Sequence, residues 1–218
     1  SFLILSLKPK DIPEPQDVKE ENKEENKEEH NESIVEETTF LNNFNSSYEI
    51  NEDLKNTIVE FFDTYYKTMK ELKMYDMSYL FKNPNGEQAL INKTAVSLIV
   101  DIRSLKDNDL TLKKAKYDLT IKDYSIDNDI IKINILEDSY INFNFMSEIT
   151  SSIYNIKNEF VFEKIDDEYK IVSYNKVQDF FVMITDRYKS GGKDTLDSIK
   201  NSYLELTKTK IENDKKAY

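Results

Sequence analysis

Cysteine and tryptophan are absent from the 218-residue sequence, and histidine occurs once. Without cysteine the chain forms no disulfide, no thiolate metal site and no cysteine nucleophile. The one histidine, His30, lies in the most polar stretch of the chain, so none is left in a foldable segment for a Ser-His-Asp triad or a metal site. We therefore expect no metal ion and no other cofactor. Any enzyme within these residues would depend on carboxylates, lysine or tyrosine.

Positive charge is scarce, because 30 Lys and Arg face 42 Asp and Glu and the net charge is -12. Proteins bind nucleic acids by neutralising phosphates with clustered Lys and Arg, and anionic lipids attract the same residues. We therefore expect neither nucleic acid nor an anionic membrane surface as a partner. More than half of the excess negative charge lies in residues 17–37.

Residues 1–16 hold a short apolar stub followed by three prolines. The apolar part, residues 2–7, is far shorter than the about 20 residues that span a bilayer. Because the sequence starts with Ser1 rather than Met, we interpret the stub as the remainder of a signal peptide or membrane anchor. Together with the lack of cysteine, this favours a secreted, cell-envelope protein of a Gram-positive bacterium. A short strand or a cloning remnant is the alternative.

Residues 17–50 are predicted to be an acidic low-complexity spacer. They contain Lys-Glu-Glu-Asn repeats, and no apolar residue occurs between Val18 and Ile34, so the repeats have nothing to bury. From residue 51 onward the apolar pattern predicts a folded domain over residues 51–190 and a helical connector over residues 191–218.

Two helices are predicted at the start of the folded domain. Asn51, followed by two acidic residues, is typical of a helix N-cap. A turn sequence at residues 83–86 precedes the second helix, expected over residues 87–106. In the first helix Asp63 is expected to project opposite an apolar stripe that consists of Leu54, Ile58, Phe61, Phe62, Tyr65, Met69 and Leu72.

Apolar residues then alternate with polar ones, which predicts an antiparallel meander. The expected strands cover residues 115–121, 131–135, 154–165 and 168–174, with residues 141–145 as a continuation of the second strand or a strand of their own. Two amphipathic helices close the chain. We therefore expect an α+β fold in which N-terminal helices pack on a curved antiparallel sheet and amphipathic helices follow.

The last helix carries a narrow apolar stripe suited to docking against one neighbour. We expect a partner protein or a second domain to bind there, on Leu196, Ile199, Tyr203 and Leu206.

The order of elements from Asn51 to Asn175 resembles the cone-shaped fold of nuclear transport factor 2-like proteins. The resemblance rests on layout and implies helices that cover one side of a strongly curved sheet.

A narrower resemblance concerns residues 159–173, EFVFEKIDDEYKIVS. This stretch is similar to the last hairpin in the N-terminal domain of secreted Firmicute amidase-type proteins, where a charged helix follows the hairpin and a hydrolase domain follows the helix. The resemblance implies that residues 194–216 are that helix and that a C-terminal hydrolase domain starts near Tyr218. It carries no catalytic residue over to this chain.

Enzymes of the cone fold hold a general acid or base inside an apolar pocket. Glu163 is our candidate, because its position along the strand matches Val161 and Ile165 and so predicts an inward side chain. Pairing with a lysine is the structural alternative. Tyr65, Tyr117 and Phe143 would line such a ligand cavity, or else serve as ordinary core aromatics.

Two functions follow as hypotheses. The first is a non-catalytic exported module that positions or binds a protein, as the accessory domain of a cell-wall amidase-type hydrolase. The second is a small-molecule-binding or isomerase-like cone-fold enzyme that uses the sheet cavity. A third hypothesis is a self-contained structural or immunity-type protein. The sequence alone does not distinguish it from the first.

Overall fold

The computed structural model describes residues 39–105, 110–145, 148–191 and 195–216. The chain divides into two compact units, Ser1–Glu37 and Thr38–Tyr218. The apolar stub and the repeats of the predicted spacer belong to the first unit and lie outside the described residues. All of the described residues belong to the second unit.

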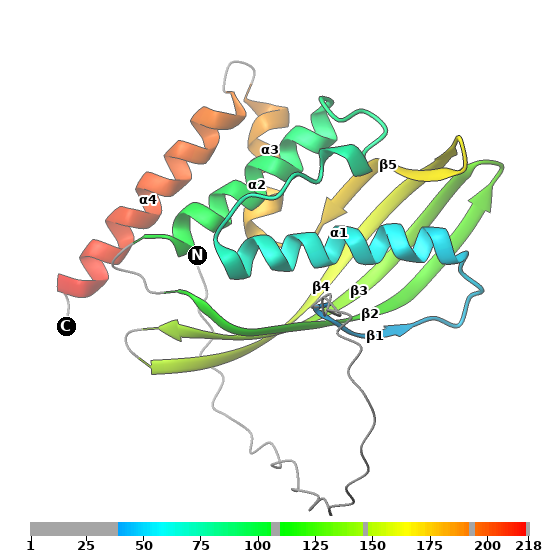
Figure 1. The fold of residues 1–218 in the computed structure, drawn as a ribbon. Helices are drawn as coiled ribbons and strands as arrows, with labels where there is room; N and C mark the ends of the chain where they lie inside the picture. The colour runs from blue at the N-terminus through cyan, green and yellow to red at the C-terminus, as the bar shows by residue number, and fades with distance from the viewer. Residues whose placement is uncertain (1–38, 106–109, 146–147, 192–194, 217–218) are drawn as a thin grey trace, which may run out of the picture. The chain divides into compact units, whose positions relative to one another are not determined.

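Five strands form one mixed sheet, and the helices lie on one side of it (Figure 1). Sheet order equals chain order, with β1 parallel to β2 and all other neighbours antiparallel. This confirms the α+β class with helices packed on a curved sheet. In chain order the elements are β1 (Leu41–Asn45), α1 (Glu52–Glu71), the 3-10 turn η1 (Ser78–Leu80), α2 (Glu87–Arg103), β2 (Leu112–Asp127), β3 (Ile130–Phe145), β4 (Glu148–Ile165), β5 (Glu168–Lys176), α3 (Asp179–Ser190) and α4 (Leu196–Lys216).

Helix α1 begins where the sequence predicts. The Asn51 side chain accepts hydrogen bonds from the backbone amides of Asp53 and Leu54, which satisfies two of the free amides of the first turn. The predicted stripe is buried except for Leu72, which ends the helix in a left-handed conformation at φ 53. The expectation for Asp63 was wrong, because its carboxylate accepts a hydrogen bond from the buried Tyr117 on β2.

Strand β3 runs without interruption from Ile130 to Phe145, so residues 141–145 continue the second predicted strand. Tight turns join the hairpins, with positive φ at Asn128 between β2 and β3 and at Asp166 and Asp167 between β4 and β5. Asn and Asp tolerate this left-handed backbone better than other non-glycine residues, which explains their place in these turns.

Strand β1 lies inside the range 17–50 that we expected to be spacer. Its residues pair with Tyr117 to Thr120 of β2, and the Phe40 carbonyl accepts a hydrogen bond from the Tyr117 amide. The folded unit therefore begins before residue 51. A strand of only five residues with three asparagines gives little alternation, and its position depends on pairing with a strand far along the chain.

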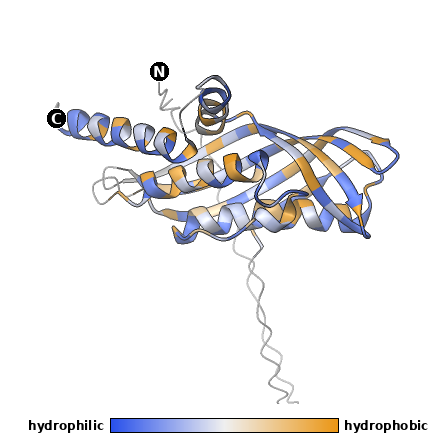
Figure 2. Ribbon diagram, turned by 90° about the horizontal axis from the view of Figure 1, so that it is seen from above, coloured by the Kyte–Doolittle hydropathy of each residue, from blue (hydrophilic) through white to orange (hydrophobic). Residues whose placement is uncertain are grey.

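The core lies between α1, α2 and the inward rows of the sheet, and it is rich in aromatic rings. Phe61 packs edge-on against Phe160 and Tyr174, and Tyr66 stacks on Tyr117 with ring centroids 4.6 Å apart. Hydrophobic and polar residues alternate along the strands (Figure 2), as a sheet with one buried face requires. No helix among the described residues is long and apolar enough to cross a membrane.

Candidate functional site

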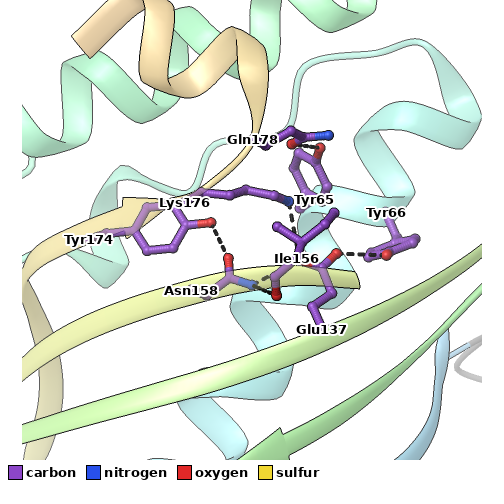
Figure 3. Close-up of polar contacts among 8 residues, drawn as sticks. All are labelled: Tyr65, Tyr66, Glu137, Ile156, Asn158, Tyr174, Lys176 and Gln178. Carbon is purple, nitrogen blue, oxygen red and sulfur yellow. Dashed lines mark hydrogen bonds and ion pairs between the residues drawn. The ribbon is translucent and has the colours of Figure 1, made fainter. Parts of the chain in front are cut away.

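A carboxylate lies in the middle of the apolar sheet face. Glu137 on β3 follows Ile131, Ile133 and Ile135 in the inward row and is 0% exposed. Its Oε1 accepts a hydrogen bond from the Tyr66 hydroxyl at 2.7 Å, and its Oε2 accepts one from Asn158 Nδ2 at 3.1 Å. The ammonium of Lys176, 3% exposed, lies 3.3 Å from Oε2. Figure 3 shows these donors converging on Glu137 from three other elements, α1, β4 and β5.

A second layer of contacts completes this buried polar cluster. The Tyr174 hydroxyl donates to Asn158 Oδ1 at 2.8 Å. The Lys176 ammonium lies 4.0 Å from the ring centroid of Tyr65, a distance that suits a cation-π contact. The Tyr65 hydroxyl in turn lies 3.4 Å from Gln178 Oε1. The cluster therefore connects α1 to β3, β4 and β5 through polar contacts, most of which are buried.

The electrostatics of the cluster fix its protonation. Burial, and then the charge of Glu137, raise the pKa of Tyr66 well above 10.0, and the same two causes raise the pKa of Tyr174. Burial lowers the pKa of Lys176, but the charges of Glu137 and Tyr65 and hydrogen bonds to both raise it more, so the net shift is upward. The lysine is therefore charged and the two tyrosines neutral at neutral pH. Because both oxygens of Glu137 already accept from protein donors, this carboxylate is poorly placed to take a proton from a ligand.

A second carboxylate, Asp63, faces the edge of the sheet. Its Oδ1 accepts from the Tyr117 hydroxyl at 2.8 Å and from the Phe40 amide at 3.0 Å, and its Oδ2 accepts from the Thr39 hydroxyl at 2.9 Å. Burial, and then the charge of Asp63, raise the pKa of Tyr117 well above 10.0. Asp63 thus ties the start of β1 to α1 and β2.

The sequence-predicted cavity residues fall in different places. Tyr65 belongs to the buried polar cluster, Tyr117 bonds to Asp63, and Phe143 is partly buried with its ring 5.8 Å from the guanidinium of Arg103. They lie on the helix-covered side of the sheet but do not converge on one group.

Glu163 does not face the interior. The inward row of β4 is Ile156, Asn158, Phe160 and Phe162, so the position of Glu163 points its side chain to the opposite face. There the Lys82 ammonium lies 2.6 Å from Glu163 Oε2. The interpretation from Val161 and Ile165 was wrong because both neighbours of Val161 are larger and are the buried ones. The glutamate is a lysine partner, although the lysine comes from the segment after η1 rather than from a neighbouring strand.

The predicted docking stripe of α4 is largely covered by the chain itself. Ile199 is fully buried, Leu196 and Tyr203 pack against the core, and only Leu206 is exposed, at 63%. Lys200 fastens the helix to α2 through the Ser97 hydroxyl at 2.7 Å and Asp101 at 2.9 Å.

Sequence reasoning missed Glu137, Asn158 and Lys176. One signal was available, because Glu137 occupies the next position in the alternation Ile131, Ile133, Ile135 and so is predicted to point inward. Lys176 carried no such signal. A register shift opposite Val161 changes the alternation of β5 between Ile171 and Tyr174, and such an irregularity is not visible in the sequence.

We also searched the rest of the described residues for a metal site and for a cleft that could hold a ligand. Within the described residues no group of three or more His, Cys, Asp or Glu side chains could hold a metal ion. An open cleft of about 520 Å³ lies beside the start of α1, and Asn51, Tyr124, Lys164 and Tyr169 are among its lining residues.

We compared the sequence with models of protein families and with curated proteins. The chain matches none of them.

Proposed function

We propose that this chain is a non-catalytic, exported module that positions or binds another protein domain. The observation that supports the proposal is the saturation of Glu137. Its two oxygens accept from Tyr66 and Asn158 and face Lys176, so the buried carboxylate serves the fold. Asp63, which also bonds to a core tyrosine, is likewise engaged by Tyr117, Phe40 and Thr39.

The partner that we propose is a C-terminal hydrolase domain of the cell-wall amidase type. The support is the resemblance of the β4–β5 hairpin, residues 159–173, to the last hairpin of the N-terminal domain in such proteins, together with the charged helix α4 that comes after it. In this arrangement an N-terminal signal or anchor directs export, and the module holds the hydrolase near its polymeric substrate.

The test begins with the native transcript on both sides of the coding segment. If the reading frame enters a hydrolase domain, the whole protein is compared with a version that lacks residues 39–216, on a soluble wall fragment and on insoluble walls. We expect activity on the soluble fragment to stay within about twofold and activity on insoluble walls to fall at least tenfold, because only the second depends on effective concentration at the polymer.

Two results would contradict this function. One is turnover of a small substrate by the isolated chain that a single carboxylate substitution abolishes. The other is an equal loss of activity on soluble and insoluble substrates when the module is removed.

The second candidate is binding of a small anionic molecule, the role of a ligand-binding or isomerase-like cone fold. It is favoured by Arg103 at the end of α2. This partly buried guanidinium donates to the Leu110 carbonyl at 2.9 Å and lies near the ring of Phe143, and no carboxylate of the described residues forms an ion pair with it. A guanidinium beside an aromatic ring suits an aromatic carboxylate.

Calorimetric titration of the chain with benzoate tests this candidate. We expect Arg103→Gln to weaken binding at least about tenfold, because it removes the charge-assisted hydrogen bonds. Equal heats for the wild-type chain and Arg103→Gln would exclude Arg103 as the anion site. Lys116→Gln is the matched control, because Lys116 is exposed between the buried Ala115 and Tyr117 and so lies on the opposite face of the sheet.

A further inference from the structure

Strand β4 has one edge that is only partly covered. Strand β3 pairs with β4 along its whole length, from Glu148 to Ile165, whereas β5 pairs with it only from Asn158 onward. Among the described residues no strand is registered against residues 151–155 on the side away from β3. In Figure 1 the first part of β4 lies at the margin of the sheet.

The backbone groups at this edge are directed outward. The Lys157 carbonyl accepts from the Val177 amide, so the backbone of Lys157 points away from β3. Backbone direction alternates along a strand, and the β3–β4 register is regular. The N–H and C=O groups of Ser151, Ile153 and Asn155 therefore also point away from β3, into the open side of the sheet.

The exposed edge is uncharged and carries two exposed hydrophobic side chains. Residues 149–156 contain no Lys, Arg, Asp or Glu, and Ile153 and Tyr154 are 61% and 46% exposed. Natural proteins protect a free edge with charges, prolines or short strands. The part of β2 that extends past β1 does carry such charges, namely Lys122, Asp123 and Asp127. Residues 151–155 contain neither a charged residue nor a proline, so this edge lacks the protection that the end of β2 has.

We propose that two copies of this chain associate through this edge, with residues 151–155 of each copy pairing as antiparallel strands about a two-fold axis at Ile153. Ser151 of one copy then lies opposite Asn155 of the other, and each outward amide meets a carbonyl. The chain as a whole carries a net charge of -12, which opposes self-association, but this pairing places no charged residue opposite another. On the outer face Ile153 adjoins its register partner Tyr140, also exposed, so the two copies bury a shared apolar strip.

The experiment is sedimentation velocity of the full chain over a range of concentrations, with two substitutions at the edge and one control. Ile153→Lys places like charges at the axis, and Ile153→Pro removes an amide that β3 does not use. We expect a reversible dimer that either substitution weakens at least about tenfold. Leu206→Lys is the matched control, because Leu206 is as exposed as Ile153 but lies on α4, and it leaves the dimer unchanged. Circular dichroism and thermal unfolding confirm that each variant is folded.

The absence of cysteine allows a second, independent readout. Under mild oxidation Ile153→Cys is expected to form a disulfide-linked dimer much faster than Leu206→Cys, because the two copies of residue 153 face each other at the axis. The proposal is overturned if the chain stays monomeric at all concentrations, if Ile153→Lys and Leu206→Lys act alike, or if the two cysteine variants cross-link at the same rate. A monomer that instead pairs with an extended peptide of another protein also overturns it. None of these results bears on the comparison of activity on soluble and insoluble walls.

Discussion

At the scale of single residues, a buried carboxylate must be matched by donors, and Glu137 is matched by Tyr66, Asn158 and Lys176. Replacing a buried ion pair by apolar residues of similar size is often neutral, whereas removing one partner leaves an unpaired buried charge. The pair therefore predicts an asymmetry between single and double substitutions.

Glu137→Leu is expected to lower the free energy of unfolding by about 3–5 kcal/mol, because it leaves the Lys176 ammonium buried without its counter-ion. Glu137→Leu combined with Lys176→Met is expected to recover most of that loss. Urea unfolding measures both. Glu163→Gln is the control, since its pair with Lys82 lies at the surface and contributes about 1 kcal/mol or less. If the double variant instead lost as much free energy of unfolding as Glu137→Leu and Lys176→Met lose together when made singly, Glu137 and Lys176 would not be coupled.

The two glutamates also show what the sequence can predict about a site. Alternate residues of a strand face the same side of the sheet, and three isoleucines precede Glu137 at alternate positions. The sequence therefore predicts that Glu137 points inward. The same reasoning fails for Glu163, because Phe160, Val161 and Phe162 are consecutive apolar residues. Either Val161 or the two phenylalanines could face inward, and the two choices place Glu163 on opposite faces of the sheet. The burial of Phe160 and Phe162 in the core decides between them, with Phe160 packed against Phe61 and Phe62 of α1, and packing is a tertiary property.

At the scale of elements, α4 was expected to offer its apolar stripe to a partner, whereas most of the stripe packs against the chain itself. Ile199→Ala is expected to lower the free energy of unfolding by about 2–4 kcal/mol, because it opens a cavity at a fully buried position. Leu206→Ala, at an exposed position of the same helix, is expected to change it by less than about 0.5 kcal/mol. Chemical denaturation compares the two, and equal effects would place α4 outside the core.

Strand β1 depends on Asp63 for its position. Asp63→Ala removes the acceptor of the Phe40 amide and the Thr39 hydroxyl, so amide hydrogen exchange in residues 40–45 is expected to quicken while exchange in α2 stays unchanged. Asp123→Ala, on the same sheet but bonded to Asn134, is the control. Unchanged exchange in β1 would mean that its backbone pairing with β2 suffices.

Elements with strong local signals were predictable, and those that depend on distant partners were not. Asn51 and the regular apolar spacing after it predict helix α1. The alternation of apolar and polar residues, together with the Asn and Asp turns, predicts strands β2 to β5. Strand β1 lies within the range predicted to be spacer, and its two apolar residues, Leu41 and Phe44, are too few to form a pattern. Its partner, β2, lies more than sixty residues further on, and Asp63 supplies the remaining contact.

At the scale of the whole molecule, buried tyrosines on α1, β2 and β5 connect stability to alkaline pH. The pKa values of Tyr66, Tyr117 and Tyr174 are raised above 10.0, chiefly by burial, and that of Lys176 is raised above 10.5. Above pH 10 the unfolded chain releases these protons while the folded chain retains them. Because the unfolded state then binds fewer protons, stability falls as pH rises, and the contribution is fully present below pH 10.

The free energy of unfolding is therefore expected to stay nearly level from about pH 7 to 9 and to fall steeply above about pH 10, with each of these groups adding up to about 1.4 kcal/mol per pH unit to the slope. Urea unfolding at a series of pH values measures the slope. Tyr174→Phe is expected to make the alkaline slope shallower by about 1.4 kcal/mol per pH unit, since one retained proton is lost. Tyr154→Phe, at an exposed position, is the matched control. If Tyr174→Phe and the wild-type chain lose stability with the same slope, the Tyr174 hydroxyl does not hold its proton in the folded state, and the interior is more open to water than its packing indicates.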